Sequence, residues 1–335
     1  MRMTLHRGIR FIWKHQTPAQ IVLTPLSWLF AIACRIRECI LKRKQKPFAV
    51  PVIVIGNISV GGNGKTSMVI ALANALKQRG HHVGIVSRGY RRTYTKTTIL
   101  MNHDMDATFV GDEAKLIWQK THCLVCISGD RSKAAKLLIE NKCDIILSDD
   151  GLQRYDFYRD IEISVTASKA LGNGKLLPAG PLRERKERLA QCDFQIELDQ
   201  SADTVNEIDS MAYEIERIES LDGKKKTSIS ELKQQQHSAI CALGNPDSFF
   251  ELLGKHGISH EEIPLPDHDK IDESLLQKHN QSVLITEKDA IKISNQKHHK
   301  HVWVIKIKPI INKNTLEKII RKISNIKQKK HQVHH

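Results

Sequence analysis

Aromatic residues are scarce in this chain. They make up 5% of its 335 residues, and no stacking platform or helix-turn-helix pattern stands out. Proteins that bind nucleic acid usually combine a basic surface with such features. The scarcity therefore argues against a nucleic-acid partner, although acidic residues are also short and the net charge is +15. The positive charge instead predicts attraction to phospholipid headgroups or to a phosphorylated substrate.

Neither a cysteine framework nor a cleavable signal peptide is evident in the sequence. Its seven cysteines are scattered. Cys123 and Cys126 lie in an apolar segment typical of a strand, where side chains three positions apart point to opposite faces, so we expect buried thiols rather than a metal or redox pair. A reducing, cytoplasmic compartment is the default. No short apolar region near Met1 ends in a cleavage site, and no obligate protein partner is evident.

A glycine-rich turn is the strongest functional signal. It follows the apolar run Val50–Ile55 and precedes a helical pattern that ends at Gly80. Strand, glycine-rich turn and helix in this order form a cradle for nucleotide phosphates, because glycines let backbone amides converge on phosphate oxygens at a helix N-terminus. The predicted phosphate-binding residues are Ser59, Val60, Gly61, Gly62, Asn63, Gly64, Lys65 and Thr66.

Two residues of this turn have specific expected roles. Lys65 would reach the β- and γ-phosphates of a nucleotide, and the Thr66 hydroxyl would ligate Mg²⁺. Ser59 departs from the strict pattern, which has glycine at that position. The alternative is a glycine-rich turn with no ligand. The order of strand, Gly-Lys-Thr and helix favours the nucleotide site.

The second signal is Asp149–Asp150–Gly151. It follows Cys143–Ser148, whose apolar centre predicts a buried parallel strand. Carboxylates at the carboxyl end of such a strand lie in the crevice where open α/β sheets bind ligands. Adjacent aspartates raise one another's pKa unless a cation is near. With the phosphate cradle upstream, we interpret the pair as a Mg²⁺ site rather than a simple turn.

Residues 1–47 form the third feature. Thr17–Gln20 predicts a helix start, and the uncharged apolar stretch that follows ends at Arg35. This stretch is shorter than the roughly 20 apolar residues of a membrane span, and Pro25 would kink it. An amphipathic helix in the membrane interface is favoured; core packing and a single span are the alternatives. The cations that would meet anionic headgroups are Arg35, Arg37, Lys42, Arg43 and Lys44.

Strands and helices alternate along the rest of the chain. This predicts an α/β fold with a doubly wound parallel sheet and a smaller second α/β domain. Predicted elements include a helix over 65–78 and strands over 124–127 and 194–198. The expected divisions are a phosphate-loop nucleotide-binding domain at 48–201, a hairpin-like linker outside the core at 202–230, the second domain at 231–326 and a frayed basic tail at 327–335.

The second domain carries two candidate sites. Gly244–Asn245–Pro246 suits a close backbone approach to a ligand, and equally a tight turn. Asp267–His268–Asp269 is the sharper signal, because a histidine flanked by carboxylates can orient or polarise a further acid across a cleft.

Taken together, these motifs resemble the tetraacyldisaccharide 4′-kinase, or lipid A 4′-kinase, family of Gram-negative bacteria. They occur in the family's order over nearly the whole chain, and the run Gly172–Glu184 is the most specific. Arg154 and Asp269 depart from the family pattern, which commonly has histidine at both positions. The matching segments are Gly56–Asn57, Val60–Thr66, Ser87–Tyr90, Gly111–Ala114, Ser148–Gln153, Gly172–Glu184, Gly244–Pro246, Pro266–His268 and Thr286–Ala290.

The resemblance implies transfer of the γ-phosphoryl group of ATP to the 4′-hydroxyl of a tetraacylated glucosamine disaccharide 1-phosphate, the lipid A precursor. It implies ATP and Mg²⁺ as cofactors and peripheral attachment to anionic phospholipids at the cytoplasmic face of the inner membrane. Lys65 and the loop amides would hold the phosphates. The implied Mg²⁺ ligands, direct or through water, are Thr66, Asp150, Glu184 and Glu113.

For the acceptor hydroxyl, the resemblance implies Asp112 as the base, assisted by His268 from the second domain. Asp149 is the rival base. The alternative function is a membrane-associated phosphate-loop NTPase switch without a lipid acceptor. Small GTPases that bind guanine usually carry an Asn-Lys-x-Asp motif, and this sequence contains none.

Overall fold

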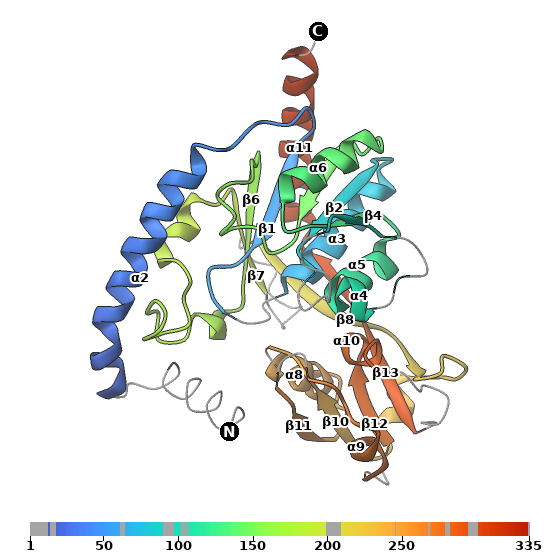
Figure 1. Ribbon diagram of the computed structural model, residues 1–335. Helices are drawn as coiled ribbons and strands as arrows, with labels where there is room; N and C mark the ends of the chain where they lie inside the picture. The colour runs from blue at the N-terminus through green and yellow to red at the C-terminus, as the bar shows by residue number, and fades with distance from the viewer. Residues whose placement is uncertain are drawn as a thin grey trace.

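A computed structural model of the chain shows one mixed β-sheet with helices packed on it (Figure 1). Thirteen strands of the described part of the chain form this sheet. The predicted α/β class is therefore confirmed. The structure describes residues 13, 18–60, 64–89, 97–101, 105, 107–198, 209–244, 246–266, 269–278, 282–293 and 301–333.

The first half of the sheet is almost entirely parallel. Its central strands are, in order across the sheet, β6 (Ile161–Thr166), β1 (Val52–Gly56), β5 (Ile145–Ser148), β2 (Val83–Ser87) and β4 (Leu124–Ile127). Two further strands flank them, namely the short antiparallel β3 (Ile99–Leu100) beside β4 and the parallel β7 (Phe194–Leu198) beside β6.

Helices cover both faces of this half because side chains alternate along each strand. Ile53 and Ile55 of β1 belong to one buried cluster, and Val52 and Val54 belong to another on the opposite face. The first cluster includes α3 and α5, and the second includes α6. The helices of this half are α3 (Lys65–Gln78), α4 (Ala107–Val110), α5 (Asp112–Thr121) and α6 (Arg131–Glu140).

The second half is smaller and has its own core. Phe250 and Leu253 of α8 pack there against Ala239 and Leu284 of two neighbouring strands. Its parallel strands are, in order, β11 (His260–Pro264), β10 (His237–Cys241), β12 (Ser282–Thr286) and β13 (Val302–Ile311). Its helices are α7 (Ile229–Leu232), α8 (Asp247–Lys255), α9 (Glu273–Lys278) and α10 (Glu287–Ala290).

One long strand, β8 (Ser210–Ser220), joins the two halves. It runs parallel to β7 and antiparallel to β13, and it forms the expected hairpin with β9 (Lys226–Thr227). The expectation that this hairpin lies outside the core is wrong. Met211 and Ile218 are 1% and 2% exposed and belong to the first and second cores. The charged residues between them mark the outer face of a half-buried strand.

The C-terminal helix, α11 (Lys313–Val333), returns to the first half and lies beside its sheet (Figure 1). Ile319 and Ile323 are buried in the first core. The basic tail, expected to be frayed, continues this helix as far as Val333. Lys327 lies 2.5 Å from Asp144 and Lys330 lies 3.0 Å from Asp160. Tertiary contacts therefore order a segment whose composition alone suggests a loose end.

The N-terminal helix, α2 (Pro18–Lys42), begins at the predicted position and contains Pro25. It lies diagonally along the outside of the first half (Figure 1). Within the described ranges, no helix combines the length and the apolar character needed to cross a membrane.

Candidate active site

The phosphate-loop segment connects the end of β1 to the start of α3. Gly64 precedes α3 with φ of 77°, a left-handed conformation that glycine adopts without strain. A Cβ at Gly64 would meet the Tyr213 hydroxyl at 3.1 Å, so a larger residue would also be crowded. Gly61, Gly62 and Asn63 lie outside the described residues. The predicted turn therefore requires glycine at position 64, directly before Lys65 and Thr66.

The start of the loop is held by the segment that contains the most specific family motif. The Val60 amide donates to the Pro181 carbonyl at 2.9 Å, and the Arg183 amide donates to the Ile58 carbonyl at 2.7 Å. Ser59, 1% exposed, pairs with Leu182 as an isolated antiparallel bridge. The run Gly172–Glu184 therefore supports the phosphate loop through backbone hydrogen bonds.

Lys65 lies between the phosphate loop and the turn formed by Asp149, Asp150 and Gly151, which we call the aspartate turn. Its Nζ is 3.3 Å from Asp150 Oδ1 and donates to Asn57 Oδ1 at 3.2 Å. The structure thus brings together Lys65 and Asp150, which the sequence analysis selected separately. Asn57 was not predicted as a site residue, although it belongs to the Gly56–Asn57 motif.

Arg131 is a buried arginine that hydrogen-bonds to the aspartate turn. Arg131, the first residue of α6, is 3% exposed and donates to the Asp149 carbonyl, the Asp150 carbonyl and the Ser148 hydroxyl. Its planar guanidinium can serve several acceptors at once. Asp150 has φ of 46°, which is uncommon for a residue with a side chain. Arg131 was missed, because only the fold places the start of α6 under the end of β5.

The two aspartates have opposite pKa shifts. Burial raises the pKa of Asp149 to about 7, and the charges of Glu113 and Asp150 act in the same direction. Burial also acts to raise the pKa of Asp150, but the cations Lys65, Arg183 and Arg131 outweigh it and the pKa is lowered. One carboxyl group is thus poised near neutral pH while its neighbour is held ionised.

Asp112 and Glu113 form the first turn of α5. Gly111 before them has φ of 93°, and Asp112 Oδ1 accepts a hydrogen bond from the Glu113 amide at 3.2 Å. Glu113 is close enough to Asp149 for its charge to raise the pKa of that group. Glu113 Oε1 lies 3.2 Å from Lys288 Nζ of α10. The predicted partner of Asp112, His268, lies outside the described residues.

Glu184 lies in a different environment from the other predicted Mg²⁺ ligands. It is 9% exposed, 3.5 Å from Arg188, and burial raises its pKa. Tyr155, Arg188 and Gln153 act to lower this pKa, and the charge of Glu38 acts to raise it. In the described part of the chain, no three acidic, histidine or cysteine side chains are grouped to hold a metal ion. The structure therefore does not gather Asp150, Glu113 and Glu184 in one place.

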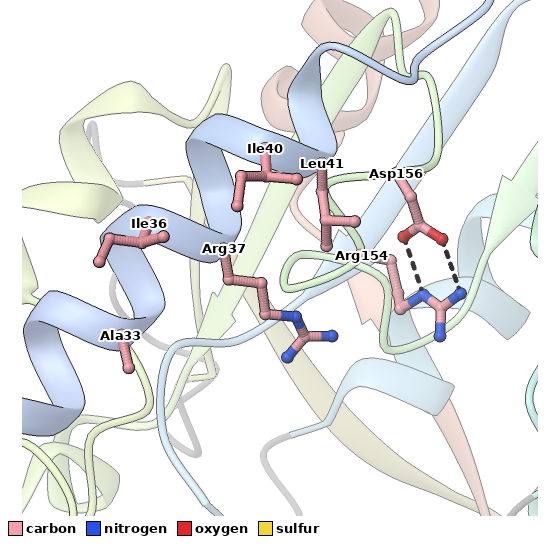
Figure 2. A pocket seen from close by; sticks show the side chains of 7 residues that line it. All are labelled: Ala33, Ile36, Arg37, Ile40, Leu41, Arg154 and Asp156. Atoms are coloured by element: carbon pink, nitrogen blue, oxygen red, sulfur yellow. Dashed lines mark hydrogen bonds and ion pairs between the residues drawn. The ribbon is translucent and has the colours of Figure 1, made fainter.

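A cavity of about 550 Å³ lies between the C-terminal half of α2 and the turn after the aspartates (Figure 2). Arg154 forms two contacts with Asp156, at 3.1 and 2.9 Å. Arg37 of α2 extends toward the same cavity. Apolar side chains of α2 complete the lining. The lining residues are Ala33, Ile36, Arg37, Ile40, Leu41, Arg154 and Asp156.

Comparison with known proteins identifies the family. A family model described as tetraacyldisaccharide-1-P 4′-kinase matches residues 19–325. This chain belongs to that family. A tetraacyldisaccharide 4′-kinase of Coxiella burnetii (strain Dugway 5J108-111) is 36% identical over 325 residues, covering 95% of each chain. One of Legionella pneumophila (strain Lens) is 37% identical over 284 residues, covering 84% of this chain and 87% of the relative.

The fold agrees with this family. A crystal structure of LpxK from Aquifex aeolicus in complex with ATP matches with a TM-score of 0.72 and 30% identity, covering 91% of this chain and 99% of the other. The resemblance inferred from the motifs is therefore confirmed, and the chain is a kinase. The candidate site residues Lys65, Asp150 and Asp112 lie at the start of α3, after the end of β5 and at the start of α5.

The opposite pKa shifts of the two aspartates predict opposite effects of substitution. Folding raises the pKa of Asp149 from its ordinary 3.8 to about 7. Between these values the folded state keeps a proton that the unfolded state releases, so stability falls as pH rises. Asp149→Asn should remove this loss. In thermal melts we expect its Tm advantage over wild type to be small at pH 4 and largest at pH 8.

Asp150→Asn is the matched control for this experiment. Folding lowers the pKa of Asp150 below its ordinary value of 3.8, so its ionised form stabilises the fold at pH values above 3.8. This contribution is lost as pH falls through the folded-state pKa. The Asp150 variant should therefore melt below wild type at pH 8. Parallel pH curves for wild type and Asp149→Asn would contradict the assignment.

Proposed function

We propose that this kinase transfers the γ-phosphate of ATP to the 4′-hydroxyl of a tetraacylated glucosamine disaccharide 1-phosphate in lipid A biosynthesis. The relatives carry that name, and the LpxK structure is a complex with ATP. The observation that supports it most directly is the 3.3 Å contact between Lys65 of the phosphate loop and Asp150. In phosphate-loop enzymes a lysine holds the β- and γ-phosphates and an aspartate holds Mg²⁺, so these two groups belong at one site.

Mg²⁺ fits this site by the chemistry of its donors. Asp149 Oδ1 is buried and has no hydrogen-bond partner within the described residues, and Asp150 Oδ1 is buried beside Lys65 Nζ at 3.3 Å. Hydroxyl and carboxylate oxygens suit a hard cation. Thr66 and Asp150 would hold the ion. When bound, Mg²⁺ would neutralise charge on the transferring phosphate. Glu113 and Glu184 remain candidates for contact through water.

The acceptor hydroxyl needs a base. We assign this role to Asp112, with His268 as its partner and Asp149 as the rival. Asp112 stands in the first turn of α5, beside Glu113, whose charge acts on Asp149. A base works best when its pKa is near the operating pH. Asp149, with a pKa of about 7, therefore remains the second candidate for the base.

The cavity beside α2 has the chemistry expected for the lipid acceptor. It combines the guanidinium groups of Arg37 and Arg154 with the apolar side chains of Ile36, Ile40 and Leu41. Guanidinium groups bind phosphate and apolar side chains contact acyl chains. A phosphorylated, acylated sugar presents both kinds of group. Arg154, which departs from the family pattern, is paired with Asp156 of the same lining, so a phosphate would compete with that carboxylate for its guanidinium group.

We assign the protein to peripheral attachment at the cytoplasmic face of the inner membrane, and helix α2 supports attachment to a membrane surface. Its polar side faces the protein: Ser27 Oγ donates to the Leu176 carbonyl at 2.9 Å and accepts from the Ala179 amide at 3.2 Å. Its apolar side faces outward, the reverse of a helix that packs on a core. Such a face suits the membrane interface. The outward large apolar residues are Ile21, Val22, Leu26, Trp28, Leu29, Ile32, Ile36 and Ile40.

Transfer of label from γ-labelled ATP into a chloroform-soluble product tests the proposed reaction. Lys65→Ala and Asp150→Ala should each lower turnover by roughly two to three orders of magnitude, because each removes charge centred on the transferring phosphate. Lys77→Ala, at the other end of α3, is the matched control and should stay close to wild type. Release of free phosphate alone would favour an NTPase switch instead.

The base assignment predicts non-additive losses of activity. If Asp112 and His268 act as a unit, then Asp112→Asn, His268→Ala and the double variant should lose similar amounts of kcat. Asp149→Asn should then lose less than Asp112→Asn. Losses that multiply in the double variant, or a larger loss in Asp149→Asn, would move the role of base to Asp149.

The membrane assignment predicts that charge on the outer face of α2 releases the protein. Ile32 and Ile36 are 58% and 56% exposed, and each buried isoleucine side chain contributes about 1.5–3 kcal/mol. The Ile32→Glu/Ile36→Glu double variant should lower binding to anionic phospholipid vesicles at least 10-fold in a sedimentation assay. Leu124→Glu, at an exposed leucine of β4, is the control. Equal binding by all three proteins would exclude α2 as the attachment site.

A further inference from the structure

The segment Thr286–Ala290 belongs to the family motifs, but the reaction described above does not use it. It forms the turn from β12 into α10. Asp289 is fully buried, and its Oδ2 accepts hydrogen bonds from the Thr286 hydroxyl at 2.7 Å and from the Ala242 amide of the neighbouring strand's end at 3.1 Å. Lys292 lies 2.9 Å from the other oxygen. The turn is therefore fixed, and with it the positions of Glu287 and Lys288.

Glu287 and Lys288 contact opposite ends of α5 in the other half of the protein. Lys288 Nζ lies 3.2 Å from Glu113 Oε1 in the first turn, and Glu287 Oε1 lies 2.7 Å from Lys120 Nζ near the last turn. Glu113 and Lys120 are seven residues apart, about two turns, and so lie on one face of the helix. The two ion pairs fix both the position and the rotation of α5 relative to α10.

We propose that Lys288 is a positioning residue for phosphoryl transfer, which sets the first turn of α5, and hence Asp112, through its ion pair with Glu113. The inference rests on the proposed role of Asp112. Lys288 is a cation of the smaller half that contacts this turn, and its side chain is only 16% exposed. Charges at such partly buried sites are screened less than surface pairs. The ion pair is therefore suited to hold the first turn of α5, which carries Asp112, at a fixed position relative to the phosphate site.

The Lys120–Glu287 pair provides an internal comparison. It joins the same two helices and is similarly covered, with exposures of 20% and 12%, but it lies two turns from Asp112. Lys120 also lies 3.4 Å from Glu216 of β8. If both pairs only hold the halves together, removing Lys120 should therefore have at least as large an effect as removing Lys288. If Lys288 positions the catalytic turn, only its removal should affect the chemical step, because small displacements of reacting groups lower rates by as much as about 100-fold.

The test compares Lys288→Met, Lys288→Arg and Lys120→Met in the full-length protein. We expect Lys288→Met to lower kcat by about 10- to 100-fold with the KM for ATP changed less than about 3-fold. Lys288→Arg should restore most of the rate, because it keeps the charge. Lys120→Met should stay within about 3-fold of wild type. Both methionine variants should have similar Tm values, so that loss of folding does not explain the difference.

A double-variant cycle with Glu113→Gln tests whether Lys288 acts through Glu113. Lys288→Met should add little to the loss caused by Glu113→Gln alone. Equal kcat losses in Lys288→Met and Lys120→Met, or losses that multiply in the cycle, would overturn the proposal. Wild-type protein that releases phosphate without labelling lipid would count against the proposed function instead, and the same comparison would then be made on ATP hydrolysis.

Discussion

The site depends on a positive charge buried under the turn that follows β5. Arg131 is 3% exposed and binds three acceptors of Ser148–Asp150. A buried charge is tolerated only when it is paired and hydrogen-bonded, and here the nearby aspartates compensate it. Burial lowers the pKa of Arg131 to about 10, which leaves it charged at neutral pH. The turn can therefore hold adjacent carboxylates without both of them being forced to take up protons.

The remaining cations act on the outer aspartate. Lys65 and Arg183 approach Asp150 at 3.3 and 3.6 Å. Arg183 comes from the same segment that supports the phosphate loop by backbone hydrogen bonds. One stretch of chain thus serves the loop through its backbone and the aspartate turn through its side chain. The polar face of α2 also packs on this stretch, through Ser27 and Leu176, so that the apolar face of α2 is fixed relative to the site.

Local patterns predicted local structure well. The bounds of α3, β4 and β7 match the predicted segments 65–78, 124–127 and 194–198, because apolar periodicity and glycine positions determine them. Lys65 and Asp150 were predicted separately, and the rule that strand ends meet at one edge of a parallel sheet explains why the structure brings them together. Contacts between distant segments could not be found this way. Arg131 lies beneath the turn only because α6 packs on β2 and β4, next to β5 in the sheet. Helix α11 is ordered by core residues that are far away in the sequence.

The continuous sheet has a mechanical consequence. The two halves are connected not by a loop alone but by the antiparallel ladder between β8 and β13, which extends from Met211–Ile311 to Ser220–Trp303 with a register shift beside Lys306. Any rotation of one half against the other must twist or bend this ribbon while its hydrogen bonds persist. Two-stranded ribbons accept larger twist than wide sheets, and irregularities concentrate bending. The connection therefore resists rotation in both directions and favours one relative orientation of the two halves, unlike a flexible hinge.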